Sequence, residues 1–562
     1  MSLDSNTGIG KERNHASDPI TLRLPPELVA RVFLFYIADC RPLLDPNAHG
    51  AVLATPKFHC SAPLYLSAVC KGWRAIAFAT PSLWTTVQIY LYSVDKISSQ
   101  SELLGQWLGR SGRLPLRIAI AQGFVCNSIP SSQASIYNII KVFARRWQKL
   151  HLLLPTNHVS LVLAETSRLA RLESLQIWLP RGLDRVPSNV EHSAALLPRM
   201  PRLISFGTGI NSTLKTPALF KNLQVCHLYS IGLDDILKVL THATNLETLL
   251  LSEPGLMPTT QGAQSGIFTH CCIKNLQIRP DLYSNAIVLP VFFQHLALPS
   301  LQCFGYDATL LRGSDVFPIH DFLAFLQRSG CSVLHEVEII GTCDSMEDRQ
   351  LIRILENLPT VTQLSLKCCE QGMSRWLNDE FFRRFGRQYD GTPPAIPPFL
   401  PNLEVLNIET SAVLMFSWTA IIDFLDSIHA SMSIRGLSEE AGSPELHIWS
   451  GQRNHIDISF ILGYAHRVRH DRAHPYISPG IVPHLTKPTW RSSINLLIKD
   501  EKGGVDLIAE SLAYSSLHQA SYEDVKRRFM LPLQVATESV LSDGDNTAKV
   551  IRVFANEEDC VR

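Results

Sequence analysis

The 562-residue sequence has no excess of charge of either sign, because its 51 Lys and Arg residues equal its 51 Asp and Glu residues. Proteins that bind nucleic acid usually gather Lys and Arg against the phosphate backbone. A neutral chain without a long basic run therefore predicts no nucleic-acid partner. The chain also has no uninterrupted apolar run of about 18 residues, the length that a membrane-spanning helix needs, so no membrane contact is predicted.

Two features of secreted proteins are missing as well. The 13 Cys residues are scattered through the chain, whereas a small secreted disulfide scaffold is much denser in cysteine. Residues 1–18 are polar and lack the apolar segment of a secretory signal. Together these observations predict an intracellular protein, cytoplasmic or nuclear or both.

The chemical motifs that would indicate an enzyme or a metal site are also lacking. No Gly-x-Ser-x-Gly motif occurs. His270-Cys271-Cys272 and Cys368-Cys369 lack the CxxC pairs of a structural zinc site, and His335-Glu336 has no second His four residues after the first. The sequence therefore predicts no catalytic residue, no metal and no cofactor, and a protein that is not an enzyme.

What the chain does contain is enough apolar surface for a large core, since 46% of its residues are hydrophobic. A chain of this length is expected to form several packed units or a repeat array. Changes in pattern divide it into a disordered leader at 1–18, helices at 19–85, repeats at 86–460 and a C-terminal cap region with loops and late strands at 461–562.

The repeats begin with a strand predicted at Thr86 to Tyr92, a helix from about Ser98 to Ser111 that ends at Gly112, and a strand at Leu114 to Ala121. A short sequence pattern then recurs, which we call the recurring phrase: its apolar residues are separated first by two residues and then by one. Its copies are Leu172-Leu175-Ile177, Leu203-Phe206, Leu223-Cys226-Leu228, Leu246-Leu249-Leu251, Ile273-Leu276-Ile278, Leu301-Phe304-Tyr306, Leu334-Val337-Ile339, Val361-Leu364-Leu366 and Leu403-Leu406-Ile408. A Pro or Asn often introduces the phrase, as at Asn222, Asn245 and Asn402.

The spacing of these copies suggests a fold class. Successive copies begin 20 to 42 residues apart, and the pattern resembles that of leucine-rich repeats, which run roughly 20 to 29 residues each. A strand with its return helix cannot bury its own apolar face, so several stacked copies are needed. The sequence therefore predicts an α+β protein, with an N-terminal helical module followed by an irregular leucine-rich-repeat-like solenoid of strands and helices.

The helical module carries a family resemblance. Apolar residues recur at spacings of three and four from Leu24 to Ala38, and a second helical pattern runs from Leu64 to Ala77. The stretch 20–33 resembles the opening helix of F-box domains, and 66–77 resembles their second segment. Thr80-Pro81-Ser82-Leu83-Trp84 matches the ending of fungal F-box-like proteins with degenerate leucine-rich repeats. The spacer from Asp39 to Pro63 is longer than in a minimal F-box.

This resemblance implies a function. In F-box proteins these helices pack on the small adaptor subunit of a cullin-based (SCF-type) ubiquitin ligase. The corresponding contact residues in this chain are Leu24, Pro25, Leu28, Val32, Val69, Cys70 and Trp73. The implied role is a substrate-recruiting adaptor whose repeat surface binds an unknown protein for ubiquitination. The alternative is a protein-interaction scaffold whose helices only cap the repeats, and a third class is an enzyme with an unrecognised motif.

Overall fold

The computed structural model describes only part of the chain. The described residues are 24–38, 62–91, 97–122, 131–163, 169–179, 200–209, 217–254, 266–280, 288–308, 317–330, 332–341, 348–368, 378–386, 399–400, 402–410, 420, 423, 457–463, 494–500 and 503–506. The predicted leader at 1–18 and most of the predicted C-terminal region at 461–562 lie outside them. None of the helices in the described part is long and apolar enough to cross a membrane.

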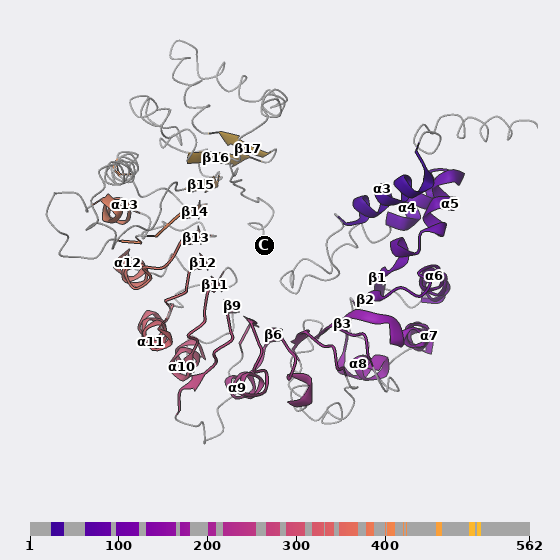
Figure 1. Cartoon of the computed structure of the whole chain (residues 1–562), viewed down its shortest axis with the longest axis horizontal. Coiled ribbons are helices and arrows are strands. Elements are labelled where there is room, and N and C mark those ends of the chain that lie inside the picture. Colours follow the sequence, from indigo (N-terminus) through magenta and orange to yellow (C-terminus); the bar gives the residue numbers. More distant parts are fainter. Residues whose placement is uncertain are drawn as a thin grey trace, which may run out of the picture. The chain divides into compact units, whose positions relative to one another are not determined.

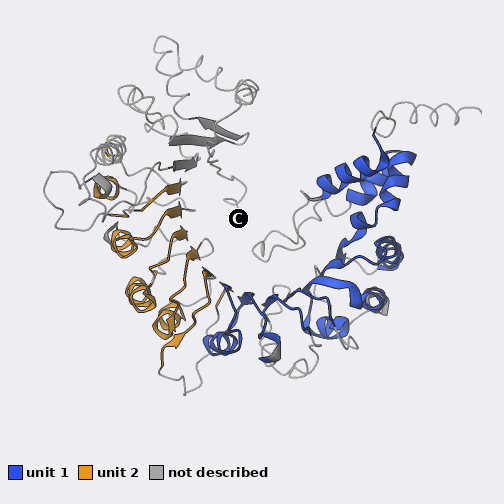
Figure 2. Cartoon of the chain, in the orientation of Figure 1, with its two compact units in different colours: residues 1–249, 257–261 blue, residues 250–256, 262–562 orange. Residues whose placement is uncertain are grey.

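The chain divides into two compact units (Figure 2). Unit 1 comprises residues 1–249 and 257–261, and unit 2 comprises 250–256 and 262–562, so the division passes through strand β7. Each unit is described by itself below.

Unit 1 begins with helices and continues as alternating strands and helices (Figure 1). Its elements are α3 (Pro26–Ala38), α4 (Ala62–Val69), α5 (Lys71–Ala79), η2 (Pro81–Trp84), β1 (Thr86–Leu91), α6 (Ile97–Arg110), β2 (Leu116–Gln122), α7 (Ser131–Val142), η4 (Ala144–Arg146), β3 (Trp147–Leu153), α8 (Thr156–Leu163), β4 (Ser174–Trp178), β5 (Ser205–Thr208), η7 (Pro217–Leu219), β6 (Val225–Tyr229), α9 (Leu233–His242) and β7 (Thr248–Ser252). From β1 to β6, each strand pairs in parallel with the next along the chain.

Unit 2 follows the same plan. Its elements are β8 (Phe268–Thr269), β9 (Asn275–Arg279), α10 (Val288–His295), β10 (Leu296–Ala297), β11 (Cys303–Asp307), α11 (Ile319–Ser329), β12 (Glu336–Ile340), α12 (Asp348–Glu356), β13 (Gln363–Cys368), α13 (Asp379–Gly386), β14 (Val405–Thr410), β15 (Asp457–Gly463), β16 (Ile494–Asp500) and β17 (Gly503–Asp506). The neighbouring strands in the order β9, β11, β12, β13, β14, β15 and β16 all pair in parallel. Strand β17 pairs antiparallel with β16. Strands β8 and β10 form a separate parallel pair.

The predicted fold class, α+β with a helical module followed by a leucine-rich-repeat-like solenoid, is wrong. Each unit is α/β: an open sheet of parallel strands, with the antiparallel β17 beside β16 in unit 2, and with helices between many of the successive strands. The helices α3, α4 and α5 belong to the same compact unit as β1 to β6. The prediction failed because residue spacing reports local structure, whereas parallel pairing depends on contacts between strands tens of residues apart.

Within each unit, the helices that connect the strands lie along one face of the sheet (Figure 1). Among the described residues, no helix covers the other face, which we call the helix-free face. Parallel sheets are usually covered on both faces. The first apolar residues of the recurring phrase, such as Leu172, Leu223 and Leu301, are fully buried.

The turns before several strands are held by side-chain amides. Asn222 donates from Nδ2 to the carbonyl of Pro201 (3.2 Å), Asn245 donates to Lys221 (3.3 Å), and Asn402 donates to Pro359 (2.9 Å). Each acceptor lies in the turn before the preceding strand. These bonds link each turn to the turn before it, which explains why an Asn introduces these copies of the phrase.

The core of unit 2 is rich in phenylalanine. Phe293 of α10 contacts Phe322 and Phe325 of α11 at centroid distances of 5.3 and 5.4 Å, and Phe304 of β11 lies 4.7 Å from Phe322. All four side chains are buried. Burying a Phe side chain contributes about 1.5–3 kcal/mol, so this cluster fixes both helices on the sheet.

Candidate docking surface on the N-terminal helices

Helix α3 begins at a proline pair. The Pro25 carbonyl accepts hydrogen bonds from the backbone N–H groups of Leu28 (2.9 Å) and Val29 (3.2 Å). Pro26 in the first turn has no N–H to leave unsatisfied. Val29 and Phe33 are buried, and they mark the inner side of the helix.

Helices α4 and α5 meet at Cys70. Its Sγ accepts from the backbone N–H of Trp73 (3.4 Å), so Cys70 caps the start of α5. Arg74 of α5 donates from Nε to the carbonyl of Ser67 in α4 (2.8 Å). The Trp73 ring lies 4.8 Å from that of Phe33, which joins α5 to α3.

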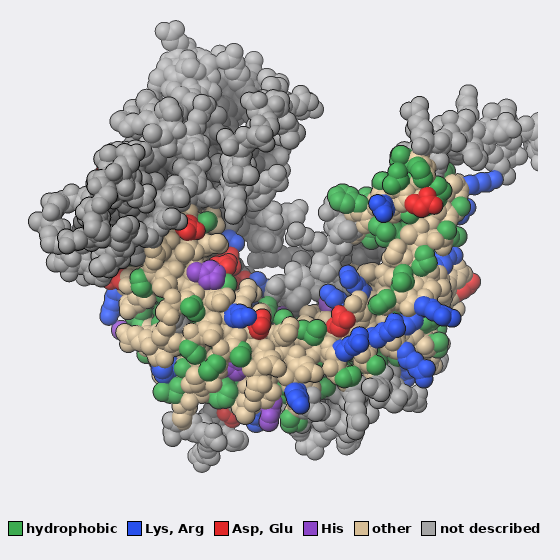
Figure 3. All heavy atoms as spheres, viewed as in Figure 1, with side chains coloured by type: hydrophobic (Ala, Val, Ile, Leu, Met, Phe, Trp, Pro, Cys, Tyr) green, Lys and Arg blue, Asp and Glu red, His purple; other side chains and the backbone are tan. Residues whose placement is uncertain are grey.

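The outer side of these helices carries exposed apolar side chains, and Figure 3 shows hydrophobic side chains gathered over this part of the chain. The exposed fractions are 39% for Leu24, 43% for Leu28, 52% for Val32, 76% for Phe35, 53% for Tyr36, 48% for Tyr65, 56% for Val69 and 40% for Phe78. We call this set the apolar patch. Residues 24–38 contain only two charged side chains, Glu27 and Arg31. Contiguous exposed apolar surface is uncommon on monomeric proteins and marks interaction sites.

The seven residues that the resemblance assigns to adaptor binding divide into two groups. Leu24, Pro25, Leu28, Val32 and Val69 are exposed. Cys70 and Trp73 are half-buried, and their contacts to each other and to Phe33 hold the three helices together.

The half-buried Trp73 has an indole N–H that is buried and has no hydrogen-bond partner among the described residues. Burying an unpaired donor of this kind costs roughly 1–3 kcal/mol.

Four aromatic residues of the patch are missing from the predicted contact set: Phe35, Tyr36, Tyr65 and Phe78. Leu28, Val32 and Phe35 recur at spacings of four and three, so they share one side of α3. The helical spacing was visible in the sequence, but it did not separate the buried pair Val29 and Phe33 from the exposed side.

The N-terminal helices are attached to α6 through Trp84. This side chain is fully buried, and its Nε1–H donates to the Ala77 carbonyl of α5 (2.8 Å). Its ring makes an edge contact with Trp107 of α6 at 4.9 Å. Arg110 of α6 lies over the rings of both Phe78 (4.0 Å) and Trp84 (4.8 Å).

The helix-free face differs between the two units. In unit 1, Trp178 of β4 contacts His227 of β6 at 4.7 Å and Tyr229 at 6.1 Å. All three side chains are buried. A Cβ at Gly207 of β5 would lie 2.8 Å from Cζ2 of Trp178, so the indole packs directly on the backbone of the intervening strand.

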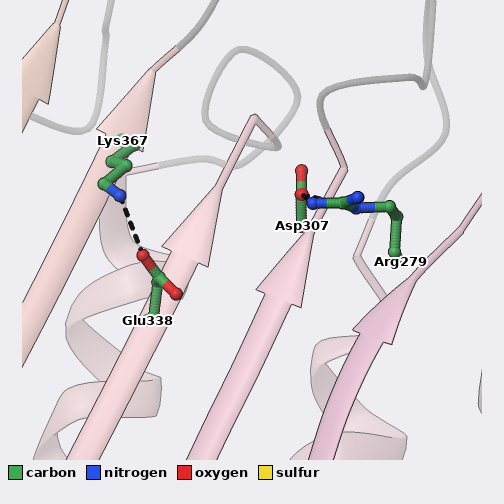
Figure 4. Close-up of polar contacts among 4 residues, drawn as sticks. All are labelled: Arg279, Asp307, Glu338 and Lys367. Carbon is green, nitrogen blue, oxygen red and sulfur yellow. Dashed lines mark hydrogen bonds and ion pairs between the residues drawn. The ribbon is translucent and has the colours of Figure 1, made fainter. Parts of the chain in front are cut away.

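In unit 2 the same face is charged. Figure 4 shows Arg279 of β9 pointing toward Asp307 of β11, and Lys367 of β13 pointing toward Glu338 of β12. Arg279 Nε donates to Asp307 (2.7 Å), and Lys367 Nζ lies 2.9 Å from Glu338. These side chains are partly exposed, and such pairs contribute little to stability, about 0–1 kcal/mol. They do make this face suitable for a polar partner.

The same face holds a group with metal-ligand chemistry that the sequence reading missed. Cys303, His335 and Glu336 each offer a ligand atom, and these atoms all lie within 4.8 Å of one another. Burial raises the pKa of the Cys303 thiol to about 11, assisted by its hydrogen bond to Glu336 and by the charge of that carboxylate. Cys303 follows Leu301 by two residues and Glu336 follows Leu334 by two. Aligning the two copies of the phrase would have placed them side by side.

No protein-family model matches the chain, and no curated protein sequence matches it. One solved structure similar to it is that of a protein from Bacteroides fragilis, determined as a structural-genomics target. The two share 12% sequence identity over 54% of this chain and 83% of that one, with a TM-score of 0.31. A likeness this low supports no inference about fold or function.

Proposed function

We propose that this protein is a substrate-recruiting adaptor of a cullin-based (SCF-type) ubiquitin ligase, active in the cytoplasm or nucleus. In this proposal α3 to α5 bind the small adaptor subunit of the ligase. The observation that supports it is the apolar patch, which includes Leu24, Leu28, Val32 and Val69 from the contact set implied by the F-box resemblance.

The patch has the character of a protein-binding surface. Burying a Leu or Val side chain that is otherwise exposed contributes about 1.5–3 kcal/mol, and a few such anchors usually dominate the affinity of an interface. An amphipathic helix of the partner could lie along the exposed stripe of α3. The patch contains few charges, so little polar desolvation would oppose the contact.

The protein to be ubiquitinated would bind elsewhere, and we place it on the helix-free face of unit 2. Arg279, Asp307, Glu338 and Lys367 give that face both signs of charge. Charge patterns of this kind favour one partner over others more than they raise affinity. The ubiquitin chemistry would belong to the recruited enzymes, while this chain supplies proximity and so raises the effective concentration of the substrate.

A second function is favoured by a different observation. Helix α5 and the turn η2 pack against α6 through contacts among Trp84, Trp107 and Arg110. Helices held in this way could serve only as a cap for the α/β part. The protein would then be an interaction scaffold without a link to ubiquitination.

Direct binding of the purified ligase adaptor, measured by calorimetry or surface plasmon resonance, separates the two functions. The test variant is the triple substitution Leu28→Ser, Val32→Ser, Val69→Ser, because these side chains are exposed and contribute little to folding. The control is Leu103→Ser, Ile204→Ser, Val333→Ser, in which side chains of similar exposure (41%, 41% and 45%) lie outside the patch. Far-UV circular dichroism checks that both variants fold.

We expect the natural chain and the control to bind, and the patch variant to bind at least about 100-fold more weakly, since anchor residues contribute about 2 kcal/mol or more each. A folded natural chain that does not bind the adaptor would overturn the proposal and leave the scaffold function. Equal weakening of both variants would show a non-specific hydrophobic contact.

A further inference from the structure

Two neighbouring strands of unit 2 place a cysteine opposite a glutamate. Cys303 is the first residue of β11, Glu336 is the first residue of β12, and their Cα atoms are register partners. The next residues, Phe304 and Val337, are buried in the core. Because side chains alternate along a strand, Cys303 and Glu336 lie on the helix-free face.

We propose that Cys303, His335 and Glu336 form a binding site for a zinc-type divalent ion. Their ligand atoms converge within 4.8 Å of one another. Zinc binds thiolate, imidazole and carboxylate at about 2.0–2.3 Å, so two ligands of a tetrahedral site lie roughly 3.5 Å apart. The Sγ of Cys303 and Oε2 of Glu336 are 3.3 Å apart, which is close to the separation that a shared ion requires.

The His335 ring is oriented by a contact to the backbone. Nδ1 of His335 lies 3.2 Å from the carbonyl of Val333. A carbonyl only accepts hydrogen bonds, so Nδ1 is the donor, which leaves Nε2 as the ring nitrogen that can bind a metal. Imidazoles that bind metals commonly donate their other N–H to a carbonyl, which fixes the ring and its tautomer. Nε2 is therefore the ligand atom that we assign to His335.

A candidate fourth ligand lies on the neighbouring strand β9. Asn275 opens β9, and its Cα is the register partner of Cys303. Its Oδ1 is buried and has no hydrogen-bond partner among the described residues. An unsatisfied buried oxygen costs roughly 1–3 kcal/mol. Coordination of the ion, directly or through a bound water, would satisfy it.

The ligand set determines the kind of ion. Calcium and magnesium prefer sites built from oxygen alone. A thiolate with an imidazole and a carboxylate suits zinc and its close substitute cobalt(II). With strong ligands from the first residues of β11 and β12 and from His335 just before β12, the site leaves one position for Asn275, water or a group from a bound partner. Local spacing in the sequence missed it because the ligands come from positions 32 and 33 residues apart.

The test uses the full chain, stripped with a chelator under reducing conditions and titrated with cobalt(II) and then zinc. We expect a thiolate-to-cobalt charge-transfer band and tetrahedral visible bands, both lost on addition of zinc. Loss of a hydrogen bond that only orients a metal ligand weakens metal binding by about 10- to 100-fold. Cys303→Ser and Glu336→Gln change the ligands themselves, so each should weaken binding by more than that. Asn275→Leu should weaken it less.

The control variant is Cys271→Ser, because Cys271 is an exposed free thiol in the same unit. It should leave the affinity and the spectrum unchanged. Far-UV circular dichroism of each variant separates loss of the site from loss of the fold. The inference fails if the folded Cys303→Ser variant takes up as much cobalt(II) as the natural chain with the same spectrum, or if the natural chain shows no thiolate band.

Discussion

Substitution of Trp84 should destabilise the N-terminal helices and the start of the α/β part together. Its side chain is completely buried, and it joins α5 to α6 through a hydrogen bond to Ala77 and a ring contact with Trp107. Removing a buried Trp side chain costs about 3–5 kcal/mol, which includes both the lost transfer free energy and the cavity. We therefore expect Trp84→Ala to lower the free energy of unfolding by about 3–5 kcal/mol.

A graded variant tests the separate contributions. Trp84→Phe keeps a ring against Trp107 but removes the Nε1–H donor and leaves a smaller cavity. One hydrogen bond contributes about 0.5–1.5 kcal/mol net, so the expected loss is about 1–2 kcal/mol. Ala77 keeps a second donor, since its carbonyl also accepts from the Thr80 N–H (3.3 Å), and no acceptor is left unsatisfied.

The assay is urea unfolding followed by far-UV circular dichroism, combined with amide hydrogen exchange in α4, α5 and α6. Leu103→Ala is the control, because Leu103 lies on the same helix as Trp107 but is 41% exposed. It should cost less than about 1 kcal/mol. If Trp84→Ala costs no more than Leu103→Ala, or if exchange increases in α4 and α5 but not in α6, the assignment of these helices to one packed unit is incorrect.

Two further results are expected from unit 1. Gly207→Ala should destabilise the protein by about 1–3 kcal/mol, because its Cβ would lie 2.8 Å from the Trp178 ring; Gly105→Ala should instead stabilise it by about 0.5–1 kcal/mol, since it lies inside α6 with no atom within 4 Å of its Cβ. Thermal unfolding of the two variants measures both changes. If both substitutions changed the stability in the same direction, the packing described would be contradicted. The third expectation concerns pH: burial lowers the pKa of His158, whose Nδ1 is 2.8 Å from the Tyr137 hydroxyl. Because the unfolded chain then binds the proton more tightly, stability should be full above about pH 6.5 and fall below it by up to about 1.4 kcal/mol per pH unit. His158→Gln should remove this part of the pH dependence, and an unchanged profile would show that the pKa of His158 is not lowered.

Several local predictions from the sequence are confirmed. The strand predicted at Thr86 to Tyr92 is β1, and the helix predicted from about Ser98 to Ser111 is α6. Gly112 follows that helix with a φ of 60°, a left-handed conformation that costs glycine little. These features depend on neighbouring residues, so a short stretch of sequence contains all the information that they need.

The apolar patch could be predicted only in part. The spacing of apolar residues from Leu24 to Ala38 indicated a helix, and that helix is α3. Spacing did not indicate that only Val29 and Phe33 would be buried while Leu28, Val32 and Phe35 stayed exposed. Burial depends on which neighbours pack against the helix, here Trp73 of α5, and that contact spans 40 residues.

The sequence by itself determined where several strands and helices lie, because hydrophobic spacing and turn residues act over a few residues. It did not determine the fold class. The recurring phrase is compatible with several arrangements of strands and helices, and only the tertiary structure decided in favour of parallel neighbours in chain order. The same register brings Cys303 beside Glu336, and Arg279 beside Asp307. These pairs depend on hydrogen bonding between strands about 30 residues apart, which no local pattern encodes.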